Sequence, residues 1–270
     1  MSDLDPQEIR RWFPQKWSEF AGNQKIVQTW RDFLTNGPCN ALFTGPSRTG
    51  KTRTVTLGIK ALCCNDRTDD LNPCGRCPTC KALNGERHSH SGVFAACTGS
   101  AYTFKVIDCE TVSGQELLEL PQELNLDDRK TIIYLDEVAA LGRRGLESLL
   151  LKPIDESYAI WLASAIKVKQ IVSKKGKALD RNSLSFPVLG RFTFKVGTSS
   201  PSIGALTQWI KDRAQDWNII IEEEVLSIPL MIKISERRVG FLILIFAAAA
   251  SRGRRIDPDW LRGFNIGPED

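Results

Sequence analysis

One segment of eight residues constrains the fold of this chain more than any other. Residues 45–52 read Gly-Pro-Ser-Arg-Thr-Gly-Lys-Thr and match the pattern G-x-x-x-x-G-K-[ST]; an apolar stretch, 41–44, precedes them and a helical pattern follows to about residue 62. Glycines in such a loop let backbone N–H groups close around phosphates at a helix N-terminus. A chance glycine-rich turn does not account for a strand, a loop and a helix in register. The candidate nucleotide ligands are Gly45, Pro46, Ser47, Arg48, Thr49, Gly50, Lys51 and Thr52.

A second apolar stretch, residues 131–137, ends in two carboxylates and supplies the expected partner of this loop. Lys51 is expected to reach the β- and γ-phosphates, and the Thr52 hydroxyl to ligate Mg²⁺. Asp136 is placed to hold the same Mg²⁺ through water, and Glu137 to orient and deprotonate the attacking water. A lone Asp-Glu pair is more often a solvated strand end, but after such a loop the two signals support each other. Together they predict hydrolysis of ATP with Mg²⁺.

The order of apolar stretches predicts an α/β fold with a parallel sheet. A helical pattern in residues 6–36 is followed by strand patterns at 41–44, 104–108, 131–135, 159–163 and 192–196. Strands that alternate with helices form βαβ units, in which helices cover both faces of the sheet. The apolar face expected for the first helix consists of Ile26, Val27, Trp30, Phe33 and Leu34.

The pattern changes near residue 200, which predicts a second domain. Residues 203–215 and 239–251 have helical patterns, and 217–232 between them are ambiguous. We therefore expect a nucleotide-binding domain at 1–200 and a small helical lid domain at 201–270.

Four cysteines within residues 63–81 predict a zinc-binding insert in the first domain. The ligands expected are Cys64, Cys74, Cys77 and Cys80. Two C-x-x-C turns that share a cysteine form a tight knuckle, and four thiolates without an open position make the metal structural. A redox C-x-x-C or free core thiols are the alternatives, but the segment is too polar for a core. The other four cysteines, Cys39, Cys63, Cys97 and Cys109, are expected to lie outside the metal site. Of these, Cys39, Cys97 and Cys109 are expected to be small buried side chains. His88 and His90 are expected in a solvated loop.

Composition adds little about partners. The 36 Lys and Arg residues exceed the 32 Asp and Glu residues only slightly, so net charge by itself does not indicate nucleic-acid binding. The longest apolar run, 239–250, is shorter than the roughly 20 residues that a bilayer requires. The N-terminus lacks the apolar region of a signal peptide. We expect no membrane partner and a cytoplasmic location.

The loop, the cysteine knuckle and the Asp-Glu strand, in this order, resemble the gamma/tau subunit family of the bacterial DNA polymerase III clamp loader, a family of AAA+ ATPases. The resemblance extends over roughly residues 10–253. It implies that Phe13, in an opening segment similar to the family's (13–24), helps form the adenine pocket. It also implies that Arg191 is an arginine finger that reaches a neighbouring subunit. Arg238 resembles a sensor that contacts nucleotide in the same subunit, although a surface arginine pair explains Arg237 and Arg238 equally well.

The chain departs from that family in four places. The polar sensor after the third strand falls near Ser164 and Ala165, which is compatible with slow hydrolysis. Gly190 and Phe192 flank the arginine where the family has Ser and Cys. Little sequence follows the lid for the family's collar domain. The stretch 167–181 is longer than in the family and is basic. A solvated hairpin and a DNA-contacting loop are equally acceptable interpretations of it. Its charged residues are Lys167, Lys169, Lys174, Lys175, Lys177, Asp180 and Arg181.

These features predict an ATP-hydrolysing AAA+ protein of clamp-loader type that works on DNA in replication or repair. The partners expected are other AAA+ subunits, DNA, and a sliding clamp or a dedicated effector protein. One alternative is a collarless AAA+ regulator in transposition or phage defence. The other is a non-hydrolysing, nucleotide-gated scaffold whose zinc knuckle binds a partner protein.

Overall fold

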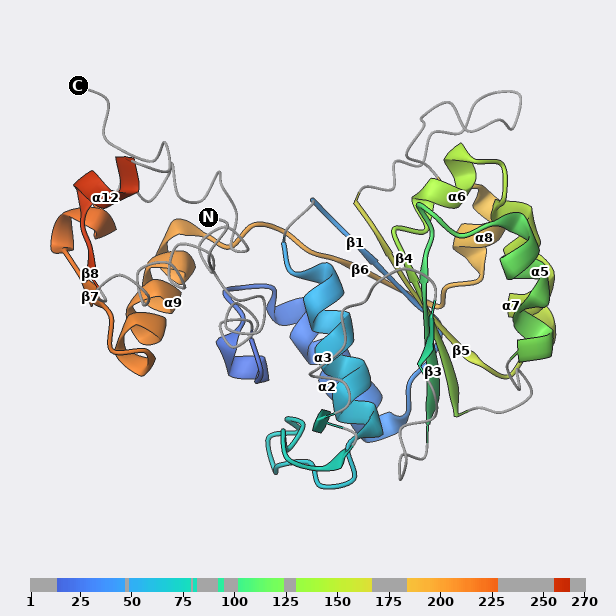
Figure 1. Ribbon diagram of the computed structural model, residues 1–270, viewed down its shortest axis with the longest axis horizontal. Coiled ribbons are helices and arrows are strands. Elements are labelled where there is room, and N and C mark those ends of the chain that lie inside the picture. The colour runs from blue at the N-terminus through green and yellow to red at the C-terminus, as the bar shows by residue number, and fades with distance from the viewer. Residues whose placement is uncertain are drawn as a thin grey trace. The chain divides into compact units, whose positions relative to one another are not determined.

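A computed structural model (Figure 1) describes residues 14–46, 49–78, 80–81, 92–94, 102–123, 130–166, 184–227 and 255–262. These residues form two compact units. The sheet unit contains the described residues of 25–46 and 54–198, and the α9 unit contains those of 14–24, 49–53 and 199–262. None of the helices in these ranges combines the length and apolarity needed to cross a membrane.

A six-stranded sheet, in the order β2-β3-β4-β5-β1-β6, forms the centre of the sheet unit. The strands are β1 (Ala41–Thr44), β2 (Gly92–Phe94), β3 (Thr103–Asp108), β4 (Thr131–Asp136), β5 (Ile160–Ala165) and β6 (Phe194–Gly197). Five are parallel, and only β2 runs antiparallel, against β3. Parallel strands are covered on both faces, which explains their short, continuous apolar runs. The parallel sheet is confirmed, whereas β2 was not expected from the sequence.

Helices cover both faces of this sheet (Figure 1). Helices α2 (Gln24–Asn36) and α3 (Lys51–Cys63) lie on one side, where Trp30 of α2 stacks on Phe43 of β1 with ring centroids 5.7 Å apart. Leu42 points to the other side and belongs to a buried core with the remaining helices. These are α5 (Gly114–Glu123), α6 (Ala139–Arg143), the 3₁₀ helix η2 (Glu147–Leu150), α7 (Leu151–Glu156) and α8 (Phe186–Gly190).

The first long helix is shorter than the sequence pattern predicts. It begins at Gln24 rather than near residue 6, because Gly22 (φ 67°) and Asn23 (φ 56°) have left-handed backbone that no α-helix continues. Among the described residues before it there is a single 3₁₀ turn, η1 (Trp17–Glu19). The predicted apolar face is confirmed: Ile26, Val27, Trp30, Phe33 and Leu34 are the buried residues of α2.

A reciprocal cap starts α5. The Ser113 hydroxyl accepts a bond from the Glu116 N–H at 3.1 Å, and the Glu116 carboxylate accepts one from the Ser113 N–H at 2.6 Å. The two bonds satisfy amides that a helix N-terminus leaves without partners. The backbone N–H of Ser113 also lowers the pKa of Glu116, because it stabilises the carboxylate.

The α9 unit is built on α9 (Ile203–Asp216), which confirms the predicted helix at 203–215. Ser202 caps it by accepting a bond from the Ala205 N–H at 3.2 Å. The unit also contains a two-stranded parallel ladder that a purely helical lid lacks. Its other elements are β7 (Ile220–Ile221), η3 (Glu223–Leu226), β8 (Arg255–Ile256) and α12 (Pro258–Arg262). The helix predicted at 239–251 lies outside the described residues, and the domain boundary at 200 stays a prediction.

The close packing of α2 against α3 can be tested by substitution of a glycine at their contact. A Cβ added to Gly58 of α3 would lie 2.2 Å from the ring of fully buried Trp30, so Gly58→Ala is expected to destabilise the protein by about 1–3 kcal/mol. The matched control is Gly204→Ala in α9, where the added methyl group meets no atom within 4 Å. Alanine favours a helix over glycine, so this variant should keep its stability or gain up to about 1 kcal/mol. Urea unfolding followed by tryptophan fluorescence gives both values; equal losses would contradict the packing argument.

Candidate functional site

The predicted phosphate loop has the strand–loop–helix arrangement. Strand β1 ends at Thr44 and α3 begins at Lys51, whereas Ser47 and Arg48 of the loop lie outside the described residues. Gly45 has φ 148°, and a Cβ there would lie 2.2 Å from Thr198 Oγ1. The close approach of Thr198, just after β6, therefore requires glycine. Gly50 (φ 90°) also has a backbone that favours glycine.

Three side chains meet at the carboxyl end of β4. Asp136 is its last residue, and one of its oxygens, Oδ1, accepts hydrogen bonds from two hydroxyl groups. The Ser164 hydroxyl of β5 donates at 2.6 Å, and the Tyr134 hydroxyl of β4 donates at 2.8 Å. The Ser164 oxygen in turn accepts the Glu137 N–H at 3.1 Å. Ser164, with 1% of its surface exposed, thus connects both predicted catalytic carboxylate residues.

The backbone turns away from the direction of β4 at Glu137, the first residue after the strand. Its backbone is left-handed, with φ 54°, and its carboxylate accepts the Ile166 N–H at 3.1 Å. The next residue, Val138, donates its N–H to the Ser164 carbonyl at 2.8 Å. Each of these contacts comes from residues at the end of β5, which therefore sets the position of Glu137.

The start of the phosphate loop meets the same strand end. The register pairs Thr44 with Ala165, and the Gly45 N–H donates to the Ala165 carbonyl at 3.2 Å. On its other side β5 pairs Ala163 with Leu135, one residue before Asp136. The end of β5 thus lies between the first glycine of the loop and the two carboxylates. Of the two candidate sensor residues, Ser164 supplies the side chain and Ala165 a carbonyl.

Sequence reasoning missed Tyr134. A signal was available: side chains alternate along a strand, so the residue two positions before Asp136 shares its face. An isolated tyrosine in an otherwise aliphatic strand pattern was the visible sign of a polar contact there.

The buried thiol of Cys109 belongs to a residue that is hydrogen-bonded to the backbone of Asp136. The Cys109 N–H donates to the Asp136 carbonyl at 3.0 Å, and the side chain is fully buried, as predicted. Burial raises the pKa of Cys109 well above its usual value, and the charges of Asp136 and Asp108 raise it further. Cys109 is therefore a neutral thiol. Cys39 was also expected to be buried, but it is partly exposed, in the irregular segment before β1.

Solved structures of RuvB from Thermotoga maritima have a similar backbone fold. One mutant aligns with a TM-score of 0.56 at 15% identity, over 96% of this chain and 76% of its own. A second mutant gives 0.57 at 14% identity, over 94% and 72%. The structure described as the RuvB Holliday junction branch migration motor gives 0.53 at 16% identity, over 93% and 71%. No protein-family model matches the sequence, and no curated protein sequence matches it.

The chain has the AAA+ P-loop fold. The sheet order and the strand–loop–helix segment are those of this fold, and the alignments, at such identities, show the fold alone.

Arg191 directly follows α8 and is engaged inside its own subunit. Its guanidinium forms an ion pair with Asp155 of α7 and donates to the Pro187 carbonyl at 2.5 Å. The Nε atom is buried without a hydrogen-bond partner among the described residues. The side chain remains 24% exposed. Its role as an arginine finger stays a prediction.

The opening segment, residues 14–24, is hydrogen-bonded to the phosphate loop within the α9 unit. The Asn23 side chain donates to the Thr49 carbonyl at 3.2 Å and accepts the Ser199 N–H at 2.9 Å. Trp209 of α9 donates from its indole to the Glu19 carbonyl at 2.7 Å. Residues 14–24 thereby contact the loop, the segment before α9 and the middle of α9. Phe13 itself lies outside the described residues.

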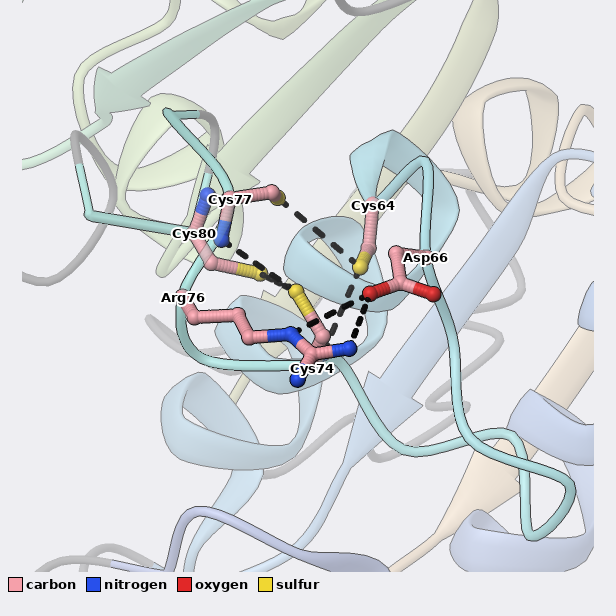
Figure 2. Close-up of polar contacts among 6 residues, drawn as sticks. All are labelled: Cys64, Asp66, Cys74, Arg76, Cys77 and Cys80. Atoms are coloured by element: carbon pink, nitrogen blue, oxygen red, sulfur yellow. Dashed lines mark hydrogen bonds and ion pairs between the residues drawn. The ribbon is translucent and has the colours of Figure 1, made fainter.

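The four predicted zinc ligands come together after α3 (Figure 2). The sulfur atoms of Cys64, Cys74, Cys77 and Cys80 all lie within 4.8 Å of one another. Two of the pairs, Cys64–Cys77 and Cys74–Cys80, are 4.0 Å apart. A tetrahedral zinc–thiolate site with bonds of about 2.3 Å places its sulfurs about 3.8 Å apart, so these residues fit Zn²⁺.

The thiols of this cluster differ in acidity. Burial raises the pKa of Cys74, but the N–H groups of Cys77 and Arg76 and the neighbouring thiols outweigh it and lower this pKa to about 6. Burial raises the pKa of Cys64 and of Cys80. Metal binding requires thiolates, so Zn²⁺ would displace the protons that Cys64 and Cys80 retain. Beside the cluster, Arg76 forms an exposed ion pair with Asp66 at 2.7 Å (Figure 2).

Several predicted residues lie outside the described ranges: Arg238, the basic stretch 167–181, Cys97, His88 and His90. Their assignments stay predictions.

Zinc content tests the cysteine cluster. Protein purified from zinc-containing medium is expected to carry about one Zn²⁺ per chain, and Cys77→Ser to lose most of it, because a hydroxyl is a poor fourth ligand beside three thiolates. Cys39→Ser, which changes a cysteine outside the cluster, serves as the control and should retain the metal. Elemental analysis by mass spectrometry provides the measurement. Equal zinc in wild type and Cys77→Ser would show that this cluster does not bind it.

Proposed function

We propose that the chain is an ATP-binding and ATP-hydrolysing AAA+ protein that acts as part of an oligomer on DNA. One observation carries the proposal: the end of β5 holds the first glycine of the phosphate loop through Ala165, and Asp136 and Glu137 through Ser164. Phosphoryl transfer needs two components. One is a loop that contacts the phosphates, and the other is a pair of carboxylates that bind a metal ion and orient water.

The residues present fit ATP and Mg²⁺. Gly45 and Gly50 have the backbone that lets a loop approach phosphates, and Lys51, at the first residue of α3, carries the positive charge. Thr52 and Asp136 offer the hydroxyl and carboxylate oxygens that Mg²⁺ prefers. Bound Mg²⁺-ATP supplies a γ-phosphoryl group for transfer to water. Glu137 orients that water and takes its proton, and Lys51 balances negative charge that develops on the phosphate.

The finer assignment is clamp-loader type, in DNA replication or repair. Its support is the sequence resemblance described above, together with the cysteine knuckle directly after α3. The RuvB structures, described as a Holliday junction branch migration motor, support work on DNA in a more general sense. Other AAA+ subunits are the expected partners, with a sliding clamp or a dedicated effector, including one in transposition or phage defence, as further candidates.

A second function, a nucleotide-gated scaffold that does not hydrolyse ATP, is favoured by one contact. The Ile166 N–H binds one oxygen of the Glu137 carboxylate and holds that side chain toward the end of β5, which restricts how it can approach a water molecule. In this alternative the zinc knuckle recruits a partner protein.

Turnover by Glu137→Gln separates the two functions. The amide keeps the size of the side chain but cannot accept the proton, so this variant should bind Mg²⁺-ATP like the wild type and hydrolyse it about 10²–10⁴-fold more slowly. Steady-state phosphate release, with and without primed DNA, and equilibrium ATP binding are the measurements. If wild type and variant both bind ATP and neither releases phosphate, the scaffold function is correct. Absence of ATP binding by the wild type would refute both.

Subunit mixing tests Arg191 in the oligomer. Lys51→Ala should abolish the subunit's own site and Arg191→Ala should lower turnover by about 10³-fold or more, since an arginine finger contributes that much. A mixture should recover activity, because intact sites then receive Arg191 from the Lys51→Ala subunits. The matched control, Asp155→Ala, breaks the same ion pair but keeps the guanidinium and should remain active. A mixture no more active than its components would contradict action between subunits.

A further inference from the structure

Tyr134 has a place that packing alone does not account for. It lies in the middle of β4 with 2% of its surface exposed, between Ile133 and Leu135, which point to the opposite face of the sheet. Buried hydroxyl groups need hydrogen-bond partners. The partner here is the Asp136 carboxylate, two residues further along the same face, at 2.8 Å.

The same carboxylate oxygen accepts a second hydroxyl. Ser164 donates to Asp136 Oδ1 at 2.6 Å from the neighbouring strand, so two donors from β4 and β5 converge on one atom. The terminal torsion of an aspartate is broad and roughly two-fold, and a single hydrogen bond restricts it weakly. Two bonds to one oxygen from different directions fix which oxygen faces inward and how the carboxylate plane is turned. Bonds to a charged acceptor are also stronger than neutral ones.

Ser164 and Tyr134 contribute differently. The Ser164 oxygen also accepts the Glu137 N–H, so it orders both carboxylate residues. Tyr134→Phe removes the phenol hydroxyl and leaves both Ser164 contacts in place. Phenylalanine has the same ring and fills the same space, so the effect of the hydroxyl can be measured separately from packing.

We propose that Tyr134 is a positioning residue for Asp136: its hydroxyl keeps the carboxylate in the orientation in which it holds, through water, the Mg²⁺ that accompanies the nucleotide. This inference rests on the proposed function, because it concerns the metal of the same site. It adds a residue that acts through Asp136 and does not itself contact nucleotide. Groups that orient a ligand in this way commonly change metal affinity by about 10–100-fold when removed.

The test is a Mg²⁺ titration of nucleotide binding to the full chain. With fluorescent ADP as the probe, wild type and Tyr134→Phe are compared from metal-free buffer to saturating Mg²⁺. The expected result is a rise of about 10-fold or more in the Mg²⁺ concentration at half effect for Tyr134→Phe, with unchanged affinity for metal-free ADP. Tyr158→Phe is the matched control, since it removes the same hydroxyl from a side chain that is 62% exposed, and it should titrate like wild type.

Each other outcome has a distinct meaning. A Mg²⁺ dependence of Tyr134→Phe equal to wild type, or a loss of ADP affinity that is the same with and without Mg²⁺, overturns the positioning role and leaves the proposed function standing. Wild type that fails to bind ADP even with Mg²⁺ overturns both. If Tyr134→Phe does not fold, Ser164→Ala takes its place, because it removes the other donor to Oδ1. Ser164→Ala must also shift the Mg²⁺ dependence, and an unshifted titration overturns the inference.

Discussion

The parallel register of three strands is the constraint on which the candidate site depends. β5 lies between β1 and β4, and parallel pairing brings the carboxyl ends of all three to one edge of the sheet. A shift of one residue in β5 would turn Ser164 to the opposite face and place Ala163 or Ala165 beside Asp136. The hydroxyl that joins Asp136 to Glu137 therefore exists only because the apolar residues of β5, packed on both faces, hold its register.

Much of the sheet unit could be predicted from the sequence, for a physical reason. Parallel strands covered on both faces must be short and apolar throughout, so the patterns at 104–108 and 131–135 stand out from their polar surroundings. The apolar face of α2 was equally visible, because burial on one side imposes the helical period. Strand β2 escaped detection since a three-residue antiparallel edge strand carries no such pattern.

The parts of the site that the sequence did not reveal depend on contacts between distant residues. Ser164 was expected near the sensor position, but its bonds to both carboxylate residues follow from strand register rather than from any local pattern. The Asn23 side chain bonds to both Thr49 and Ser199, and these contacts depend on a left-handed backbone that only the folded turn imposes. The pairing of Arg191, which follows α8, with Asp155 of α7 joins two residues that are 36 positions apart in sequence, and no local pattern predicts it.

The cysteine knuckle has a consequence for the charge of the site it forms. Each sulfur of Cys64, Cys74 and Cys77 accepts a backbone N–H from further along the segment, at 3.3 to 3.4 Å. Four thiolates around one Zn²⁺ carry a net charge of about −2, and these amides face that excess charge directly. The backbone thus provides dipolar compensation for that charge. These donated N–H groups lower the electrostatic cost of holding four thiolates around one ion.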